Sequence, residues 1–312
     1  MYQAIPTPLV SVLIVSMKEE KTISKCLETL LSGFVGNLEI LVSIPDEPTF
    51  LAIQKTAARL NLADRLFRSP MSMSGKAHGK PAELDELMKM ARGDFWIFAD
   101  GDTSFGNSSI PKLLTKFNQN PNIVAVSGRP ISADHKDNMM GYFGHLLADA
   151  AHARRQQMQN VDNGYFFPVS GYLFAMRRNS YRLPNDALAD DAFISYKILN
   201  DHKQIAYCPE ANVYVKYATT LKDFYKQKKR SVGGFVQLKK YGLLKKAPQT
   251  RSFWQEVSWF WFPIKYAKNT RELFWSLALY PIRFWLWVMI FWEQRIIKKD
   301  FRSTWERVES TK

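Results

Sequence analysis

The 312-residue sequence contains little cysteine and no recognisable export signal. Its two cysteines, Cys26 and Cys208, are far apart and have no metal-ligand spacing, which argues against a disulfide framework and indicates a reducing compartment. The first residues, MYQAIPTPLV, lack a basic segment, and the first apolar run has only the length of a strand, so no secretory signal is expected. The sequence also lacks internal repeats and low-complexity tracts.

The net positive charge and almost all of the tryptophan lie in the last third of the chain. Residues 1–215 hold 22 Lys/Arg and 22 Asp/Glu, whereas residues 216–312 hold 21 Lys/Arg and 7 Asp/Glu, which accounts for the whole net charge of +14. Eight of the nine tryptophans follow residue 250. This change predicts two regions, and Gly233–Gly234 is taken as their boundary: a domain over residues 1–234, neutral up to residue 215, and a basic, aromatic region over residues 235–312.

The first hundred residues alternate between apolar strand-like and amphipathic helix-like segments. Strands are expected at 10–16, 38–44, near 65–67 and at 95–99, with helices at 22–31, 49–60 and 83–91 between them. A polar Gly/Ser/Lys/Pro loop is expected at 70–82. This order is typical of βαβ units, so we predict an α/β fold with a doubly wound, mostly parallel sheet.

The segment FWIFADGD ends the strand at 95–99 with two carboxylates, Asp100 and Asp102, on either side of Gly101. Open α/β sheets bind ligands outside the carboxyl ends of their strands. Mg²⁺ binds to proteins through one or two carboxylates and completes its shell with water or substrate phosphates. The segment therefore indicates a metal site, the structural alternative being a solvated Asp-Gly turn.

The middle of the chain adds a second acidic pair and more basic residues. Asp190 and Asp191 open a predicted helix at 192–199, where acidic residues also match the helix dipole. Lys76 and Lys80 precede the DGD segment. The other expected elements are a helix near 109, a strand at 123–127, a helix at 140–160, a β-rich stretch at 165–178, strands near 204–208 and 212–216, and a helix at 220–230 that ends at a hinge or domain edge, Gly233–Gly234.

Together these pieces resemble the family 2 glycosyltransferases of the GT-A fold. The resemblance covers about residues 9–235 and rests on SVLIVSMKEEKTISKCLETLL, GKPAELDELMKMARGDFWIFADGD, SGYLFAMRR, ADDAFISYKI and QKKRS, in that order. It implies a Rossmann-like nucleotide-diphospho-sugar transferase fold. It also implies inverting sugar transfer from a nucleotide-diphosphate sugar, with a UDP-sugar favoured, to a hydroxyl acceptor.

The resemblance assigns roles to the donor-site residues of this chain. Asp102 would hold Mn²⁺ or Mg²⁺ on the diphosphate, and Asp100 would hold the metal or the ribose. Glu19 and Asp46 match positions that contact the nucleoside, and Lys80 matches the basic residue of a Gly-Lys segment.

The resemblance also places the acceptor chemistry. Asp191 matches the general base that removes the acceptor proton, beside Asp190, which replaces the usual Glu. Gln227 and Arg230 match a Gln-x-x-Arg-Trp motif near the acceptor and the diphosphate. Ser231 stands in place of the Trp of processive members, which favours the addition of one or a few sugars.

Two other functions fit some of these residues. Asp100-Gly101-Asp102-Thr103 matches the Asp-x-Asp-x-Thr motif of haloacid-dehalogenase-type phosphatases, in which the first Asp is a nucleophile. In those enzymes the motif follows the first strand, whereas three strand–helix units precede it here. A domain that only binds a sugar nucleotide, or a basic module that binds a membrane surface, is the non-catalytic alternative.

The C-terminal region favours attachment to a membrane. Residues 273–292 form an apolar, aromatic run with the length of a membrane span, roughly 20 residues. Arg283 near its middle disfavours a simple lipid-exposed span. Basic residues before it and after it, the latter being Arg295, Lys298, Lys299 and Arg302, suit helices that lie in an anionic interface. Packing on the catalytic domain is the alternative. We expect attachment to the cytoplasmic face of a membrane, with an interfacial or re-entrant position favoured over a single full span. We also expect a lipid-linked or glycan acceptor and no nucleic acid.

Overall fold

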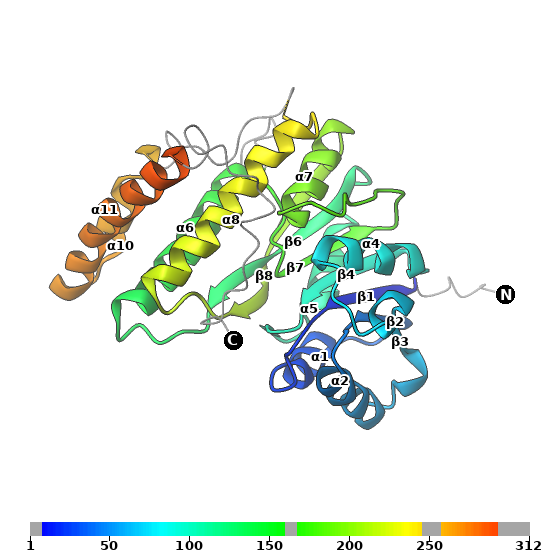
Figure 1. Cartoon of the computed structure of the whole chain (residues 1–312). Coiled ribbons are helices and arrows are strands. Elements are labelled where there is room, and N and C mark those ends of the chain that lie inside the picture. Colours follow the sequence, from blue (N-terminus) through cyan, green and yellow to red (C-terminus); the bar gives the residue numbers. More distant parts are fainter. Residues whose placement is uncertain (1–7, 160–166, 245–256, 293–312) are drawn as a thin grey trace. The chain divides into compact units, whose positions relative to one another are not determined.

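The structure, a computed structural model, describes residues 8–159, 167–244 and 257–292 (Figure 1). The chain forms two compact units. The first comprises Met1–Pro130, Val169–Asn185 and His202–Tyr214, and the second comprises Ile131–Pro168, Asp186–Asp201 and Val215–Lys312.

Four parallel strands form the first part of the sheet in the order β3-β2-β1-β4. They are β1 (Val10–Val15), β2 (Leu38–Ser43), β3 (Leu66–Arg68) and β4 (Phe95–Asp100). The three longer strands are almost wholly buried because their runs are apolar on both faces. The predicted strands are confirmed.

The helices that connect these strands cover both faces of the sheet. They are α1 (Ile23–Leu31), α2 (Glu47–Arg59) and α4 (Lys80–Met90), with a short 3₁₀ turn η1 (Ala63–Arg65) before β3. Right-handed crossovers place α1 and α2 on one face and α4, which returns the chain from β3 to β4, on the other (Figure 1). The chain therefore changes direction between β1 and β4, and the expected doubly wound sheet is confirmed.

Four more strands complete the eight-stranded sheet in the order β7-β6-β8-β5 beyond β4. They are β5 (Ser104–Phe105), β6 (Ile123–Ser132), β7 (Leu173–Arg177) and β8 (Gln204–Val215), with α5 (Ser109–Lys116) between β5 and β6. β7 is antiparallel to both β4 and β6, and β5 is antiparallel to β8.

Two sequence expectations in the first unit were wrong. The strands expected near 204–208 and 212–216 form one strand, β8, which continues through Pro209 and pairs with β5 at Val213 and Tyr214. The expected loop at 70–82 contains a short helix, α3 (Pro70–Met73), and the first turn of α4, since Pro70 and Pro81 both occupy first-turn positions, where proline is favoured.

The second unit contains α6 (Met139–Gln159), α7 (Asp190–Asn200), α8 (Leu221–Lys240), α10 (Trp261–Tyr266) and α11 (Thr270–Trp292). The helix end expected before Gly233 was wrong, because α8 continues for two more turns. A Cβ atom at Gly234 would lie 2.5 Å from the Cβ of Ala189. The glycine therefore permits α8 to pass close to the start of α7 and is not a hinge.

The C-terminal helices pack on α6 through one hydrophobic cluster. Tyr142, Phe143, Phe224 and Leu279 are buried in it. The Tyr142 hydroxyl lies 2.7 Å from the Ser276 hydroxyl, which donates to the Pro263 carbonyl. The aromatic C-terminal helices therefore do pack on other helices of the chain, which was the alternative to membrane attachment. The packing covers only one side of α11.

Candidate active site

The carboxyl ends of β1, β2 and β4 lie in one row. Val15 pairs with Ser43 on one side and with Asp100 on the other. Ser16 N–H continues the row by donating to the Ser43 carbonyl at 3.1 Å. The three segments that follow these strands therefore leave the sheet side by side, at the point where the strand order reverses.

The DGD segment forms a tight turn at the end of β4. The Thr103 hydroxyl donates to the Asp100 carbonyl at 2.7 Å, and so does the Thr103 N–H at 3.3 Å. A Cβ atom at Gly101 would lie 2.4 Å from Ser16 Oγ and 2.9 Å from the Ile23 side chain. Glycine is therefore needed between the two aspartates because the turn packs directly on the end of β1 and the start of α1.

Lys80 is brought to the same turn by α4. Its Nζ lies 2.7 Å from Asp100 Oδ1, and each side chain is 22% exposed. Lys80 is the first residue of α4 and follows Gly79, whose positive φ of 94° favours glycine. The strand end and the helix start thus place one ammonium group on one of the two carboxylates. Lys76, by contrast, is exposed.

Glu19 joins this group from the segment after β1. It is 5% exposed, and its Oε2 accepts a hydrogen bond from the Thr22 hydroxyl at 3.1 Å. Its N–H donates to Thr49 Oγ1 at 2.8 Å. Thr22 Oγ1 also lies 3.3 Å from the Gly101 carbonyl, so one hydroxyl connects the Glu19 segment to the DGD turn.

The buried thiol of Cys26 lies within the field of these carboxylates. Burial raises the pKa of Cys26, and the charges of Asp102, Asp100 and Glu19 raise it further, in that order. The three carboxylates therefore lie around the first turns of α1. Cys26 is a free, buried cysteine of the core.

The carboxylate pair fits a hard divalent cation that shares its ligands with a substrate. Within residues 8–159, 167–244 and 257–292, no group of three or more His, Cys, Asp or Glu side chains is arranged to hold a metal alone. Asp100 and Asp102 supply oxygen ligands at a strand end, which is the ligand type that Mg²⁺ and Mn²⁺ prefer. The remaining ligands would have to come from water or from phosphate.

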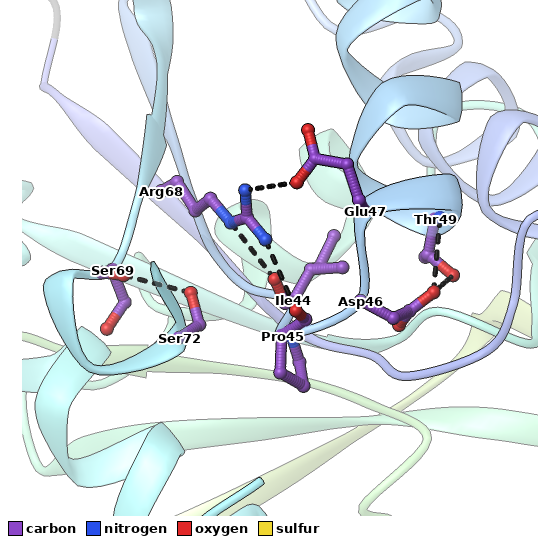
Figure 2. Close-up of polar contacts among 8 residues, drawn as sticks. All are labelled: Ile44, Pro45, Asp46, Glu47, Thr49, Arg68, Ser69 and Ser72. Carbon is purple, nitrogen blue, oxygen red and sulfur yellow. Dashed lines mark hydrogen bonds and ion pairs between the residues drawn. The ribbon is translucent and has the colours of Figure 1, made fainter. Parts of the chain in front are cut away.

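Asp46 has a structural role at the start of α2. Its carboxylate accepts hydrogen bonds from the Thr49 hydroxyl, the Thr49 N–H and the Lys18 N–H, at 2.6, 3.2 and 2.8 Å. Burial acts to raise the pKa of Asp46, but these hydrogen bonds outweigh it and lower the pKa below its usual range. Figure 2 shows the Asp46–Thr49 contacts.

Arg68, which was not among the residues selected from the sequence, holds the segment that carries Asp46. From the end of β3 its guanidinium donates to the carbonyls of Ile44 and Pro45 and to the carboxylate of Glu47 (Figure 2). It also lies 4.2 Å from the centre of the Phe50 ring. One basic side chain on the edge strand thus fixes the β2–α2 connection. A basic residue at the end of a short predicted strand was the only signal.

The second acidic pair lies in the second unit, at the start of α7. Asp191 Oδ1 accepts from the Ala192 N–H at 2.8 Å, and the Asp191 carbonyl accepts from the Ser195 hydroxyl at 2.5 Å. Asp190 is 7% exposed. Gln227 and Arg230 are partly buried on α8. The structure thus assigns Glu19, Asp46, Lys80, Asp100 and Asp102 to the first unit and Asp190, Asp191, Gln227 and Arg230 to the second.

Comparison with known families decides the identity of this fold. The family described as glycosyltransferase like family 2 matches residues 6–234. The chain belongs to this family. The expected GT-A glycosyltransferase is confirmed. The same match argues against the alternative of a haloacid-dehalogenase-type phosphatase.

Solved structures support the fold. A mannosyltransferase from Pyrobaculum calidifontis, solved with GDP-mannose and Mn²⁺, superposes with a TM-score of 0.63 at 17% identity, over 95% of this chain and 89% of that one. Glucosyl-3-phosphoglycerate synthase from Mycobacterium tuberculosis, solved with Mn²⁺, UDP and phosphoglyceric acid, gives 0.50 at 14% identity, over 74% and 78%. No curated protein sequence matches the chain.

The contact of Gly101 with Ser16 gives a direct prediction. Gly101→Ala should lower the free energy of unfolding by about 1–3 kcal/mol, as overpacking of a buried contact does. Ser16→Gly in the same chain should restore most of that loss, because it removes the two nearest atoms that the new methyl group meets, Ser16 Oγ and Cβ, and leaves only the flexible end of the Ile23 side chain. Urea unfolding measures both values.

Gly106→Ala is the matched control, because its Cβ atom would lie 3.2 Å from the Asn212 Cβ and should cost less. If Gly101→Ala were as stable as the parent, or if Ser16→Gly gave no recovery, the described packing of the turn would be wrong.

Proposed function

We propose that the chain is a metal-dependent inverting glycosyltransferase that uses a nucleotide-diphosphate sugar and a hydroxyl acceptor at a membrane. The observation that carries the proposal is the cluster of Asp100, Asp102 and Lys80 at the point where the strand order reverses. Belonging to the family makes it a glycosyltransferase. The donor, the inverting mechanism, the acceptor and the membrane are the parts that we propose.

The donor site is built from opposite charges. Asp102, with Asp100, would hold Mn²⁺ or Mg²⁺, which when bound neutralises the diphosphate and stabilises it as a leaving group. Lys80 would share that task, moving between Asp100 and the diphosphate oxygens. Glu19 and Asp46 would contact the nucleoside from the segments after β1 and β2. A UDP-sugar is the favoured donor, and GDP- and dTDP-sugars are the alternatives.

The transfer itself needs a base for the acceptor. The acceptor oxygen forms a bond to the anomeric carbon as the bond from that carbon to the diphosphate breaks, and the Asp191 carboxylate takes the hydroxyl proton. A single displacement of this kind inverts the anomeric configuration. Asp190 would support Asp191, while Gln227 and Arg230 would bind the diphosphate and the acceptor.

The two sides of α11 suggest how the chain meets a membrane. With about 100° between successive residues, the most exposed apolar side chains fall in one arc of ~120°. They are Phe274, Leu277, Phe284, Trp285, Val288, Phe291 and Trp292. Ser276, Leu279, Leu286 and Ile290 are buried on the opposite side. Arg283 falls by position on that opposite side, so it does not prevent the exposed side from entering lipid.

An anionic lipid surface is the partner that this side of α11 fits. Exposed Trp and Phe suit the headgroup boundary, and the excess of Lys/Arg over residues 216–312 is complementary to negative lipid headgroups. In the described part of the chain, α11 is the one helix whose length and composition would allow it to cross a membrane. Because one side packs on α6, we propose an interfacial position at the cytoplasmic face, which brings a lipid-linked or glycan acceptor within reach. The basic residues after 292 lie outside the described residues.

Substitutions in the two acidic pairs should affect different steps: the first pair donor binding, and the second pair the transfer reaction. Asp102→Asn should abolish the Mn²⁺-dependent rise in Tm caused by a nucleotide-diphosphate sugar, because it removes a metal ligand. Asp191→Asn should keep that rise and lower kcat by roughly 10²–10⁴-fold, the contribution of a general base. A screen of UDP-, GDP- and dTDP-sugars, with and without Mn²⁺, identifies the donor.

If Asp102→Asn bound the donor as the parent does, the metal assignment would fail. If Asp191→Asn had the kcat of the parent, Asp191 would not be the base. If none of these donors raised the Tm of the parent chain, the proposed donor site would be wrong.

Binding to vesicles should depend on the exposed side of α11. Replacement of Phe274, Trp285 and Phe291 by Ser should weaken binding to mixed phosphatidylglycerol–phosphatidylcholine vesicles by more than about tenfold, because each aromatic ring would lose part of the ~1.5–3 kcal/mol of its burial. Cosedimentation measures the partition.

The control removes exposed apolar side chains elsewhere, with Val35→Ser and Leu51→Ser in the first unit. Equal partition of the α11 variant and the parent, or equal weakening by the control, would contradict the proposed membrane surface.

A further inference from the structure

We propose that Gln237 of α8 and Tyr241, the C-cap residue of that helix, are positioning residues that fix the backbone leading into Asp190 and Asp191. The inference rests on the proposed role of Asp191 as the base. It concerns residues 186–189, which connect to α7 and have no regular secondary structure. Side chains must therefore supply the hydrogen bonds that a helix or a strand would otherwise provide.

The Gln237 amide bonds to both sides of this segment. It is 5% exposed, its Nε2 donates to the Asp186 carbonyl at 2.6 Å, and its Oε1 accepts from the Leu188 N–H at 2.8 Å. Both groups of the amide are thus used on backbone atoms two residues apart. An unsatisfied donor or acceptor on a buried amide costs free energy. The two hydrogen bonds therefore favour this one conformation of residues 186–189.

The next turn of α8 holds the side chain of Asp186. The Tyr241 hydroxyl donates to Asp186 Oδ1 at 2.6 Å, and Lys240 Nζ lies 3.5 Å from Oδ2. The Tyr241 hydrogen bond is the largest cause that lowers the pKa of Asp186, followed among the lowering effects by the charge of Lys240. Asp186 is therefore held as a carboxylate near neutral pH, and its backbone is held by Gln237.

The preceding turn of α8 approaches the last residue before the acid pair. Gly234 lies against Ala189, with room for no larger residue in the present packing. Aromatic contacts continue onto α7, where Phe193 packs against Tyr241 with ring centres 5.4 Å apart and Tyr196 packs against Phe235 at 6.1 Å. Two turns of α8 and its C-cap residue thus hold residues 186–189 and the first turns of α7.

This arrangement links two parts of the proposed machinery. α8 carries Gln227 and Arg230 in its first half and the contacts to residues 186–189 in its second half. Because a base displaced by about 1 Å can cost 10²-fold in rate, the acid pair needs such support. The same helix would therefore set both the base and the groups that contact the diphosphate and the acceptor.

The first test is Gln237→Leu in the full chain, which keeps the volume and removes both hydrogen bonds. We expect kcat to fall roughly 10–100-fold with the donor KM unchanged. The donor-induced rise in Tm with Mn²⁺ should also stay, because the substitution removes hydrogen bonds to Asp186 and Leu188 and leaves the diphosphate-binding side chains of α8 in place. The other donor-site residues, Glu19, Lys80, Asp100 and Asp102, belong to the other unit. Tyr241→Phe, a smaller change, should lower kcat less.

Gln237→Glu gives a readout that a general loss of stability would not give. A protonated carboxyl reproduces the amide pattern, since its O–H donates to the Asp186 carbonyl and its C=O accepts from the Leu188 N–H. An ionised carboxylate lacks the donor. The ratio of variant to parent kcat should therefore be near one at low pH and fall toward the Gln237→Leu value as pH rises through the pKa of the new carboxyl, which burial raises.

Thr220→Ala is the matched control, because Thr220 caps α8 by accepting from the Asp223 N–H and does not contact residues 186–189. It should lower Tm and leave kcat at the parent value. A pH-independent kcat ratio for Gln237→Glu, or parent kcat in Gln237→Leu, would overturn the inference while Asp191→Asn stayed inactive. Parent activity of Asp191→Asn would overturn the proposed base instead. If Gln237→Leu does not fold, Gln237→Glu and Tyr241→Phe decide.

Discussion

The alignment of β1 with β4 is the constraint on which the donor site depends. Pairing of Val15 with Asp100 places the end of β4 beside the segment that carries Glu19, at the reversal of strand order. The close contact of Gly101 with Ser16 then fixes the turn between the two aspartates. Lys80 completes the cluster because α4 begins at this edge of the sheet, and its ion pair balances one of the two negative charges.

In the second unit, helix packing positions the proposed functional residues, whereas in the first unit strand register does so. α8 passes close to the start of α7 because Gly234 has no side chain, and its later residues hold the segment before the acid pair. On another side of the unit, α11 buries Ser276 and Leu279 against α6 and leaves its aromatic side exposed. The helices that we assign to the base and to the membrane surface thus belong to one packed body.

Much of the donor site could be predicted from the sequence, and the support of the acid pair could not. Apolar runs buried on both faces, alternating with amphipathic helices, predicted the parallel strands, and a hydrophobic strand that ends in DGD predicted the carboxylate pair. Those signals are local in sequence. Arg68 and Gln237 act on backbone groups more than twenty residues away, so no spacing indicates them. From the sequence, Gly233–Gly234 was read as the end of a helix. The actual reason for glycine at position 234 is the close approach of Ala189, a tertiary contact that the local sequence does not reveal.

The proposed donor site requires that a divalent metal join the donor diphosphate to the DGD turn. Anomalous diffraction at the manganese edge, from crystals of the full chain grown with Mn²⁺ and UDP, is the decisive measurement. We expect a peak within about 2.5 Å of Asp102 carboxylate oxygens and in contact with the diphosphate. A nucleotide bound with its diphosphate away from Asp100 and Asp102, or a manganese peak on other residues, would contradict it.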